Sequence, residues 1–254
     1  MNQLRFGRWQ DALADVESVD AIVADPPYGK RTHERQCHRR KDSPAHTRDA
    51  GTLNLSSRGL SYDHWTSRDV REFVDHWAPR CRGWFCAMTS HDLVPHWEKR
   101  LEKHGLYVHA PLACVQHAMN VRLSGDGHSN WTVWMVTARP RWKNTWGALR
   151  GAYVGPSHDP GQNSLDRSKR AVAGGKPLWL MREIVEDHSR PGDLVCDPCA
   201  GGGTTLLAAK LSGRRYIGAE MDPETHRLAT ERLAGLGPSM TPAGQIGMFA
   251  GGKR

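Results

Sequence analysis

The sequence has 254 residues, of which 38% are hydrophobic and 24% charged, and this suits one soluble domain with a substantial core. Its 35 lysine and arginine residues outnumber its 27 acidic residues, and the resulting net charge of +8 favours a polyanionic partner. No apolar run is long enough to span a membrane, and the N-terminus lacks the apolar core of a signal peptide, so we expect a cytoplasmic protein. The six cysteines are scattered and lie mostly in apolar runs, which argues against a disulfide framework.

Seven short apolar runs, each bounded by glycine, proline or charge, predict buried β-strands. They lie at residues 4–7, 19–24, 83–90, 107–115, 131–138, 193–196 and 214–220. Amphipathic stretches predict helices at residues 91–105, 177–189, 204–213 and 222–235. Strands that alternate with helices predict a doubly wound, mostly parallel α/β sheet of seven strands. Because no convincing helix separates the fourth run from the fifth, we expect one antiparallel strand there.

Two stretches and the C-terminal tail do not fit this pattern. Residues 30–61 are polar, histidine-rich and basic, and residues 139–175 are rich in Arg, Trp, Gly, Ser and Asn. We expect both to be loops or small insertions on a single domain that spans residues 1–254. The tail, residues 235–254, is rich in glycine and proline and is predicted to be flexible.

A triple glycine lies between a predicted strand and a predicted helix, in the segment VCDPCAGGGTTLLAAK at residues 195–210. Glycine brings bare backbone close to a ligand, and the helix start points amide groups at it. Glu220 ends the next predicted strand, about twenty residues later, where an acid contacts ribose hydroxyls in such folds. Leu206 replaces the third glycine of a dinucleotide site, and no P-loop lysine follows. The pattern favours a nucleoside cofactor without a pyrophosphate, and S-adenosylmethionine is the obvious candidate.

The segment Asp-Pro-Pro-Tyr at residues 25–28 follows the second predicted strand. Proline rings fix φ and remove N–H donors, so that the backbone carbonyls point one way. A carbonyl and the Asp25 carboxylate together offer two hydrogen-bond acceptors at this strand end. Tyr28 offers a ring face on which a base can stack. Taken alone, the segment fits a capped strand end equally well.

Taken in order, these segments resemble the class-β amino-group DNA methyltransferases, which methylate adenine N6 or cytosine N4. DPPY at 25–28 is similar to the catalytic tetrad of that family, and DPCAGGGTT at 197–205 to its cofactor loop. KPLWLMREIVEDHSRPGDLVCD at 176–197 looks like the lysine–proline segment and helix that precede the loop. GAEMDPE at 218–224 resembles the ribose-binding strand end. The tetrad precedes the glycine loop, as in a circularly permuted methyltransferase sheet.

The resemblance implies an enzyme that flips a base out of double-stranded DNA and transfers a methyl group directly from S-adenosylmethionine. In the family, an Asp at the start of the tetrad leans towards adenine N6. The alternatives are cytosine N4, an RNA methyltransferase, or a catalytically silent module that binds cofactor or DNA. The catalytic residues implied by the resemblance are Asp25, Pro26, Pro27 and Tyr28. The cofactor-binding residues implied are Asp25, Lys176, Asp197, Pro198, Cys199, Ala200, Gly201, Gly203, Thr204, Glu220 and Asp222.

Two positions depart from the family pattern. Cys199 stands where the cofactor loop commonly has an aromatic residue, and Arg8 stands where an acid commonly reaches the cofactor adenine. Cys196 and Cys199 form a C-x-x-C pair that flanks a strand end and the start of a loop. Burial explains this pair better than metal binding does.

Basic residues after the tetrad are well placed to contact DNA phosphates, although a solvated loop is the alternative interpretation. They are Lys30, Arg31, Arg35, Arg39, Arg40, Lys41 and Arg48. His33, Cys37, His38 and His46 lie in the same stretch, but their spacing is too irregular to predict a metal site.

Three residues of the second insertion, Trp142, Trp146 and Arg150, fit two interpretations: they help to read a DNA sequence, or they pack on the sheet. Because little sequence is left for a separate recognition domain, a homodimer is a further hypothesis. The segment GQIGMF at 244–249 is similar to peptides that dock on bacterial sliding clamps, although we favour a frayed terminus.

Overall fold

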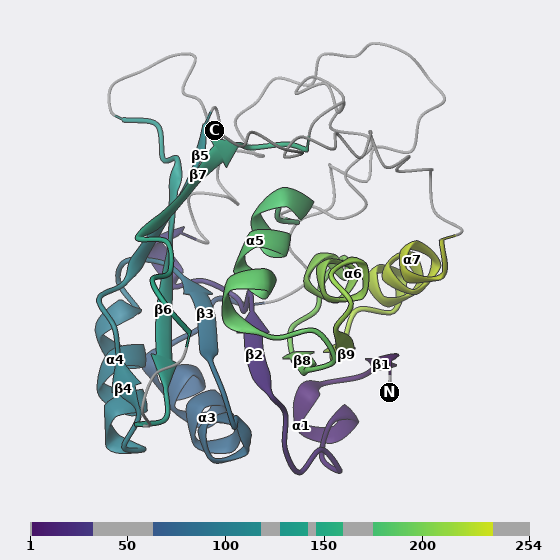
Figure 1. The fold of residues 1–254 in the computed structure, drawn as a ribbon, viewed down its shortest axis with the longest axis horizontal. Helices are drawn as coiled ribbons and strands as arrows, with labels where there is room; N and C mark the ends of the chain where they lie inside the picture. The colour runs from purple at the N-terminus through teal and green to yellow at the C-terminus, as the bar shows by residue number, and fades with distance from the viewer. Residues whose placement is uncertain (1, 33–62, 118–127, 142–145, 160–174, 236–254) are drawn as a thin grey trace, which may run out of the picture.

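The computed structural model describes residues 2–32, 63–117, 128–141, 146–159 and 175–235. These residues form an α/β fold around one mixed sheet of nine strands (Figure 1). The strand order is β1-β9-β8-β2-β3-β6-β5-β7, and β4 pairs with β6 beside this path. No helix in these ranges is both long enough and apolar enough to cross a lipid bilayer.

The strands are β1 (Asn2–Phe6), β2 (Ala21–Ala24), β3 (Phe85–Thr89), β4 (Tyr107–Val108), β5 (Leu112–His117), β6 (Thr132–Arg139), β7 (Ala152–Pro156), β8 (Leu194–Asp197) and β9 (Arg215–Glu220). The helices are α1 (Trp9–Ala12), α3 (Ser67–Trp77), the 3-10 helix η2 (Ala78–Arg80), α4 (Val94–Lys103), α5 (Leu178–His188), α6 (Thr204–Leu211) and α7 (Pro223–Ala234).

The single antiparallel strand of the sheet is β6. It runs antiparallel to β3, β4 and β5, whereas β1, β9, β8, β2 and β3 pair with one another in parallel, as do β5 and β7. Both the mostly parallel sheet and the antiparallel strand between residues 107 and 138 are therefore confirmed. The seven predicted runs are all strands, although residues 107–115 divide into β4 and β5.

Strand β7 lies within residues 139–175, which the sequence predicts to be loops or a small insertion, and with the division of 107–115 it raises the strand count from seven to nine among the described residues. This strand lies at the edge of the sheet, and only Tyr153 and Gly155 of its five residues are buried there. A short edge strand with exposed Ala152, Val154 and Pro156 carries too few apolar residues to stand out in the sequence.

The helices cover both faces of the sheet, as a doubly wound fold requires. On one face, α1, α3 and α4 pack on the sheet around Trp77, Phe85 and Trp97. On the other face, α5 and α6 pack around Met135, Leu180 and further aliphatic side chains (Figure 1). The helix α3 was not among the predicted helices. Its sequence signal is a capping box, in which the Thr66 and Asp69 side chains each accept from the backbone of this helix start.

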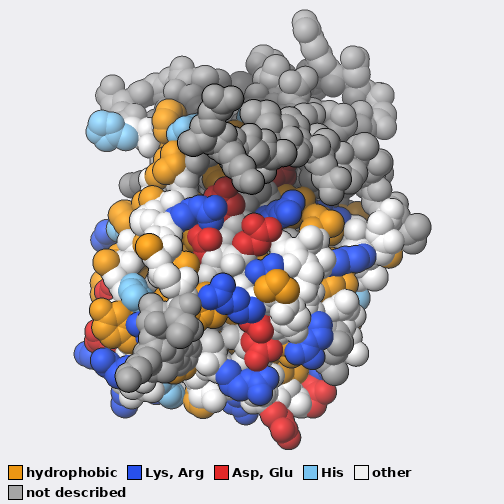
Figure 2. All heavy atoms as spheres, in the orientation of Figure 1, with side chains coloured by type: hydrophobic (Ala, Val, Ile, Leu, Met, Phe, Trp, Pro, Cys, Tyr) orange, Lys and Arg blue, Asp and Glu red, His pale blue; other side chains and the backbone are white. Residues whose placement is uncertain are grey.

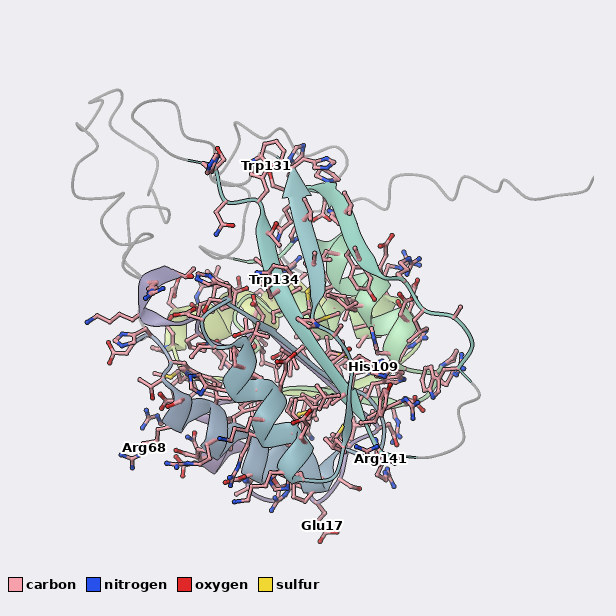
Figure 3. All side chains as sticks on the ribbon, turned by 90° about the vertical axis from the view of Figure 1, so that its left-hand side faces the viewer. Glu17, Arg68, His109, Trp131, Trp134 and Arg141 are labelled. Carbon is pink, nitrogen blue, oxygen red and sulfur yellow. The ribbon has the colours of Figure 1, made fainter. Side chains whose placement is uncertain are left out.

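The strands β5, β6 and β7 extend beyond the carboxyl end of β3. The last residue of β3, Thr89, lies level with Trp134 of β6, which in turn lies level with Ala113 of β5. β5 continues from there for four residues to His117, which pairs with Pro156. At about 3.3 Å per residue, the extension is about 13 Å long. We call this part the projecting strands: residues 114–117, 131–133 and 153–156. It rises above the rest of the sheet in Figure 3.

Candidate functional site

The tetrad and the glycine loop follow the carboxyl ends of two neighbouring parallel strands. β2 pairs with β8, with Ala21 level with Val195 and Ile22 level with Cys196. The Asp25 turn after β2 and the loop after β8 therefore leave the sheet at the same edge, where ligands bind in open α/β sheets. The electrostatics agree, because the Asp25 charge contributes to raised pKa values of both Asp197 and Cys199, after burial as the main cause.

The Asp25 carboxylate is held by two neighbours. The Tyr28 hydroxyl donates a hydrogen bond to Asp25 Oδ1 at 2.7 Å, and Lys176 Nζ donates to Asp25 Oδ2 at 2.5 Å. Lys176 Nζ also lies 5.0 Å from the centroid of the Tyr28 ring. Only 9% of the Lys176 side chain is exposed, so this ion pair is mostly shielded from water. Lys176, predicted as a cofactor-binding residue, thus contacts the tetrad itself.

The backbone after Tyr28 is anchored over the end of β3. Gly29 N donates to Ser90 Oγ at 2.9 Å, and Trp65 N donates to the carbonyl oxygen of Tyr28 at 3.0 Å. A side chain at Gly29 would place its Cβ 2.4 Å from Asp92 Oδ2, so the Asp92 carboxylate would have to move to accommodate any residue but glycine. Sequence reasoning missed Ser90 and Asp92, although both are polar residues that follow a buried strand.

The glycine loop connects β8 to α6 through two residues with positive φ. Gly201 has a φ of 51° and Gly203, the N-cap of α6, has a φ of 71°, a region that side chains disfavour. Ala200 N donates to the Ala219 carbonyl at 2.9 Å, which ties the loop to β9. A Cβ on Gly203 would lie 3.3 Å from the Ala229 Cβ of α7. The glycines therefore serve both the turn and close helix packing.

Glu220 joins the end of β9 to this loop. Its Oε2 accepts from Gly201 N at 2.9 Å and its Oε1 accepts from Asp222 N at 2.7 Å. Burial raises the pKa of the Glu220 carboxyl. Asp222 in turn caps α7, because its Oδ1 accepts from Thr225 N at 2.8 Å. The two predicted cofactor-binding acids of this segment thus lie together at the strand end.

Asp197 is the most deeply buried acid of the site, with 1% of its surface exposed. Its Oδ1 accepts from Cys199 N at 3.1 Å, and burial raises its pKa to about 7. The Cys199 thiol, whose pKa is raised by burial, lies within electrostatic range of Asp197, Glu220 and Asp25. Three acidic groups therefore lie close enough to act on this thiol, and their charges would favour a positively charged ligand at this edge.

Two residues that sequence reasoning did not single out support this site. Arg232 of α7 donates to the Gly202 carbonyl at 3.0 Å and to Thr204 Oγ1 at 2.9 Å, which fixes the end of the loop. The Asp159 carboxylate accepts from the backbone N–H groups of Leu178 and Trp179, and so caps α5 just after Lys176. Arg232 and Asp159 are far in sequence from the groups that they contact, so neither could be identified without the fold.

The predicted DNA-contacting residues are only partly described. Lys30 and Arg31 are exposed directly after the tetrad. The predicted residues that lie outside the described ranges are Arg35, Arg39, Arg40, Lys41, Arg48 and Trp142, together with the four His and Cys residues of the first insertion and the segment 244–249. Within the described ranges, no group of three or more His, Cys, Asp or Glu residues could hold a metal ion.

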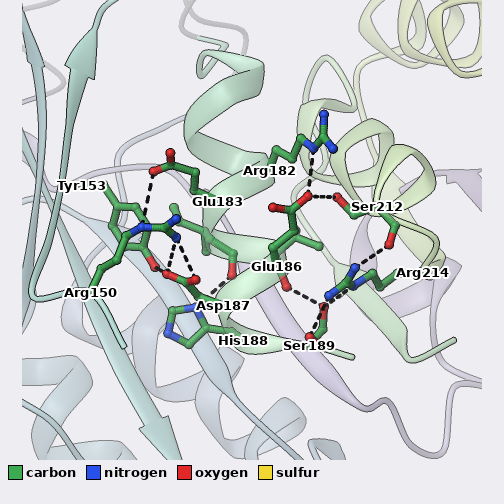
Figure 4. Close-up of polar contacts among 12 residues, drawn as sticks. Arg150, Tyr153, Arg182, Glu183, Glu186, Asp187, His188, Ser189, Ser212 and Arg214 are labelled. Atoms are coloured by element: carbon green, nitrogen blue, oxygen red, sulfur yellow. Dashed lines mark hydrogen bonds and ion pairs between the residues drawn. The ribbon is translucent and has the colours of Figure 1, made fainter. Parts of the chain in front are cut away.

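Trp146 and Arg150 lie at the opposite end of α5 from Lys176. The Arg190 guanidinium lies 4.0 Å from the Trp146 ring centroid, and Arg150 Nη1 is 2.7 Å from both carboxylate oxygens of Asp187 (Figure 4). Asp187 is in the last turn of α5, before the start of β8, so these contacts are remote from the tetrad. Of the two interpretations, the contacts favour packing on the fold.

A family model described as N6/N4 DNA methylase matches residues 124–231. This stretch contains Lys176, the glycine loop and Glu220, and the tetrad precedes it in the permuted order. This part of the chain, less than half of its length, therefore matches the N6/N4 DNA methyltransferase family.

Relatives within this family match locally in sequence and broadly in structure. DNA adenine methyltransferase YhdJ of Escherichia coli (strain K12) is 43% identical over 58 residues, which are 23% of this chain and 20% of YhdJ. The chain spans less than a third of the length of the curated relatives that it matches first.

Two solved structures show the same fold. The complex of M1.HpyAVI with SAM aligns over 91% of this chain and 100% of that chain, with a TM-score of 0.63 and 23% identity. PvuII DNA methyltransferase, described as cytosine-N4-specific, aligns over 91% of this chain and 86% of that chain, with a TM-score of 0.61 and 14% identity. The methyltransferase sheet predicted from the sequence is therefore confirmed.

Proposed function

We propose that this protein transfers a methyl group from S-adenosylmethionine to the N6 amino group of adenine in double-stranded DNA. The observation that carries the proposal is the common edge from which the Asp25 turn and the triple-glycine loop leave the adjacent strands β2 and β8. A methyl donor at the loop and an amino group at the turn would then share one cleft.

The residues at the loop fit a positively charged nucleoside. A Cβ at Gly201 would meet nothing within 4 Å, so the backbone there is open to a ligand. Glu220 lies at the end of β9, and its carboxylate accepts from the backbone of Gly201, Asp222 and Met221 and keeps a lone pair for a ribose hydroxyl. The acids around Cys199 would stabilise a cation. When bound, S-adenosylmethionine supplies an electrophilic methyl carbon on a sulfonium. Because position 199 is a cysteine and not an aromatic residue, the charges of these acids would be the main interaction with the sulfonium there.

The tetrad residues would orient the amino group that receives the methyl group. The bonds from Tyr28 and Lys176 fix the plane of the Asp25 carboxylate, yet each carboxylate oxygen keeps a lone pair for an amino hydrogen. A carbonyl of the proline turn would accept the second hydrogen. This arrangement draws the amino nitrogen towards tetrahedral geometry and frees its lone pair for attack. Pre-ordering by Lys176 means that the carboxylate need not reorganise during the reaction.

DNA is the proposed substrate because the chain carries a net charge of +8, and Lys30 and Arg31 are exposed next to the tetrad. A base inside a duplex cannot reach Asp25, so it would have to be flipped out of the helix. The homodimer and the sliding-clamp contact stay predictions.

Cytosine N4 is the second candidate, since the same fold occurs in a methyltransferase described as cytosine-N4-specific. An exocyclic amino group on a cytosine presents the same two hydrogens to the tetrad. The Asp at the start of the tetrad, which leans towards adenine in the family, is the reason to prefer N6.

The proposal is tested by incubating the protein with labelled S-adenosylmethionine and unmethylated genomic DNA, and then digesting the DNA to nucleosides. N6-methyldeoxyadenosine is the expected product. N4-methylcytosine nucleosides would overturn the choice of adenine. Label in a structured RNA but not in DNA would contradict the proposal as a whole. So would the absence of label from both nucleic acids when the folded protein binds the cofactor. Asp25→Ala should abolish the label while cofactor binding persists.

A further inference from the structure

The projecting strands carry an exposed tryptophan that the proposed methyl transfer does not use. Trp131 precedes β6 and is 41% exposed, and its carbonyl accepts from Gln116 N at 2.7 Å. Figure 3 shows it at the far end of these strands, beyond the level at which β3 stops. Its ring contacts the His117 ring edge-on, with 6.0 Å between the centroids, and the exposed part of the indole is a surface that a partner can cover.

Gln116 lies directly opposite Trp131 and presents a second unusual feature. It is 3% exposed, and its Nε2 has no hydrogen-bond partner among the described residues. A buried amide donor without an acceptor is unfavourable, and each such group in a folded protein needs an explanation. An acceptor on a ligand would satisfy it.

Gln116 lies on the face of the sheet that packs against Tyr28, because Cys114, two residues earlier on β5, belongs to the same buried cluster as Tyr28. Gln116 is paired with Gly155 of β7, and its backbone N–H donates to the carbonyl oxygen of Trp131, the residue before β6. The Trp179 ring of α5 covers this face, since a Cβ on Gly155 would lie 2.6 Å from it. Trp179 follows three residues after Lys176, the partner of Asp25.

The thiol of Cys114 provides an independent link between the projecting strands and the tetrad. It lies on the same face as Gln116, two residues earlier on β5, and burial raises its pKa to about 12. After burial, the charges that act on this thiol are those of Lys176 and Asp25. The two sites are therefore close enough for one DNA molecule to reach both.

We propose that Trp131 and Gln116 form a second nucleobase-binding subsite, which holds a DNA base outside the tetrad while the target base is flipped. This inference rests on the proposed function. An indole ring stacks on any base, and a primary amide offers a donor and an acceptor to a base edge. The described parts of the projecting strands and their flanks, residues 112–117, 128–134 and 152–159, contain no lysine or arginine. This surface therefore suits base contacts and not phosphate contacts.

The other end of β6 offers a natural comparison. Tyr107, paired with the last residue of β6, is 43% exposed, which is close to the exposure of Trp131. Its ring is covered by two guanidinium groups, those of Arg139 at 5.3 Å and Arg141 at 5.6 Å from the centroid. Tyr107 is therefore satisfied by its own chain and lies at the edge of the sheet remote from Asp25.

The test uses Trp131→Ala, Trp131→Phe and Gln116→Leu, with Tyr107→Ala as the matched control. Methyl transfer to duplex DNA is measured at saturating cofactor, cofactor affinity is measured directly, and DNA affinity is followed by fluorescence anisotropy at several salt concentrations. We expect Trp131→Ala to raise KM and Kd for DNA about tenfold, with kcat and cofactor affinity unchanged. Trp131→Phe should restore most of the affinity, and Tyr107→Ala should change nothing.

Salt dependence and base dependence separate a base contact from a structural effect. Loss of a stacking contact leaves the slope of DNA affinity against salt unchanged, whereas loss of a phosphate contact reduces it. Gln116→Leu should weaken DNA binding about fivefold for some flanking bases and not for others, without lowering Tm.

Equal DNA affinities of Trp131→Ala and Tyr107→Ala would overturn the subsite, as would a reduced salt slope for Trp131→Ala. A wild-type protein that binds DNA but transfers no methyl group would overturn the proposed function instead. The anisotropy series would still decide whether the subsite exists.

Discussion

The two ends of helix α5 differ in how their charges are matched. At its C-terminal end, Arg150 pairs with Asp187, and the Tyr153 hydroxyl donates to the same carboxylate at 2.8 Å (Figure 4). Arg182 bonds Glu186 in the same turns, and Arg214 bonds Ser189. Figure 2 shows basic and acidic side chains interspersed across the face over α5 and α6. This end forms a closed polar network that joins α5 to β7 and to the segment before β9.

At its N-terminal end, the acidic groups of the site gather around two cations, Lys176 and Arg232. Lys176 contacts Asp25, Asp197 is buried and Glu220 is partly buried, and burial raises the pKa values of both Asp197 and Glu220. This difference is what we expect if polar groups at the C-terminal end stabilise the fold and those at the N-terminal end form the proposed cofactor site. Burying an acid without a cation is unfavourable, and a site that binds a cationic cofactor explains why the fold retains it.

The largest expected effect comes from removing one acid at each end. Asp25→Ala should lower kcat for methyl transfer by about 10³-fold, because the acceptor that orients the amino group is lost. Cofactor affinity and Tm should change little. The matched change, Asp187→Ala, should leave kcat of the folded protein intact but destabilise it by about 2 kcal/mol, since it removes the acceptor of the buried Tyr153 hydroxyl. Steady-state kinetics and denaturant unfolding of both variants measure this contrast. Equal loss of activity in the two variants would contradict it.

Removing the cations sharpens the same comparison. Lys176→Met should lower kcat by about 10²-fold, because the Asp25 carboxylate loses the donor that fixes Oδ2. Arg150→Met removes a half-exposed partner of Asp187 and should lower Tm by only a few degrees. Single-turnover methyl transfer and thermal unfolding test the pair. A Lys176→Met variant with full activity would show that the ion pair is structural.

The motifs of the candidate site could be predicted from the sequence, whereas the contacts between distant residues could not. The Asp25 turn, the glycine loop and Glu220 could be predicted because each is a local pattern at the end of an apolar run. The contact between Lys176 and Asp25 joins residues 151 positions apart, and local patterns carry no information about such a pair. Arg232 and Asp159 were missed for the same reason. β7 was missed because its burial alternates over only five residues at a sheet edge.

Cofactor binding should depend on pH through Asp197. Burial raises the pKa of this acid to about 7 without a ligand, so the folded protein holds a proton there that the unfolded chain releases near the ordinary value of 3.8. Stability should therefore decline as pH rises from about 4 to about 7, and level off above that. A cationic ligand favours the ionised acid, so binding releases this proton.

Cofactor affinity should thus weaken by up to about tenfold for each pH unit below about 7, and stay constant above it. Isothermal titration calorimetry across this range, in buffers of different ionisation enthalpy, measures both the affinity and the released proton. Asp197→Asn is the control and should remove the dependence. An affinity that does not change with pH in the wild-type protein would contradict the proximity of the cofactor cation to Asp197.

The smallest expected effect concerns a helix that belongs to neither end. Thr66→Ala removes the hydroxyl that accepts from Arg68 N and breaks the capping box of α3. We expect a loss of about 1 kcal/mol in the free energy of unfolding, with kcat unchanged. Thr66→Ser is the control and should be close to wild type. A larger fall in activity than in stability would mean that α3 contributes to the site.

A crystal structure of the protein with S-adenosylmethionine bound gives the most direct test of the shared edge. If the Asp25 turn and the glycine loop serve one reaction, the transferable methyl carbon should point towards the Asp25 carboxylate, with room for one amino nitrogen about 3 Å from it. A cofactor seated on the glycine loop with its methyl group directed away from Asp25, or bound elsewhere on the molecule, would contradict the account.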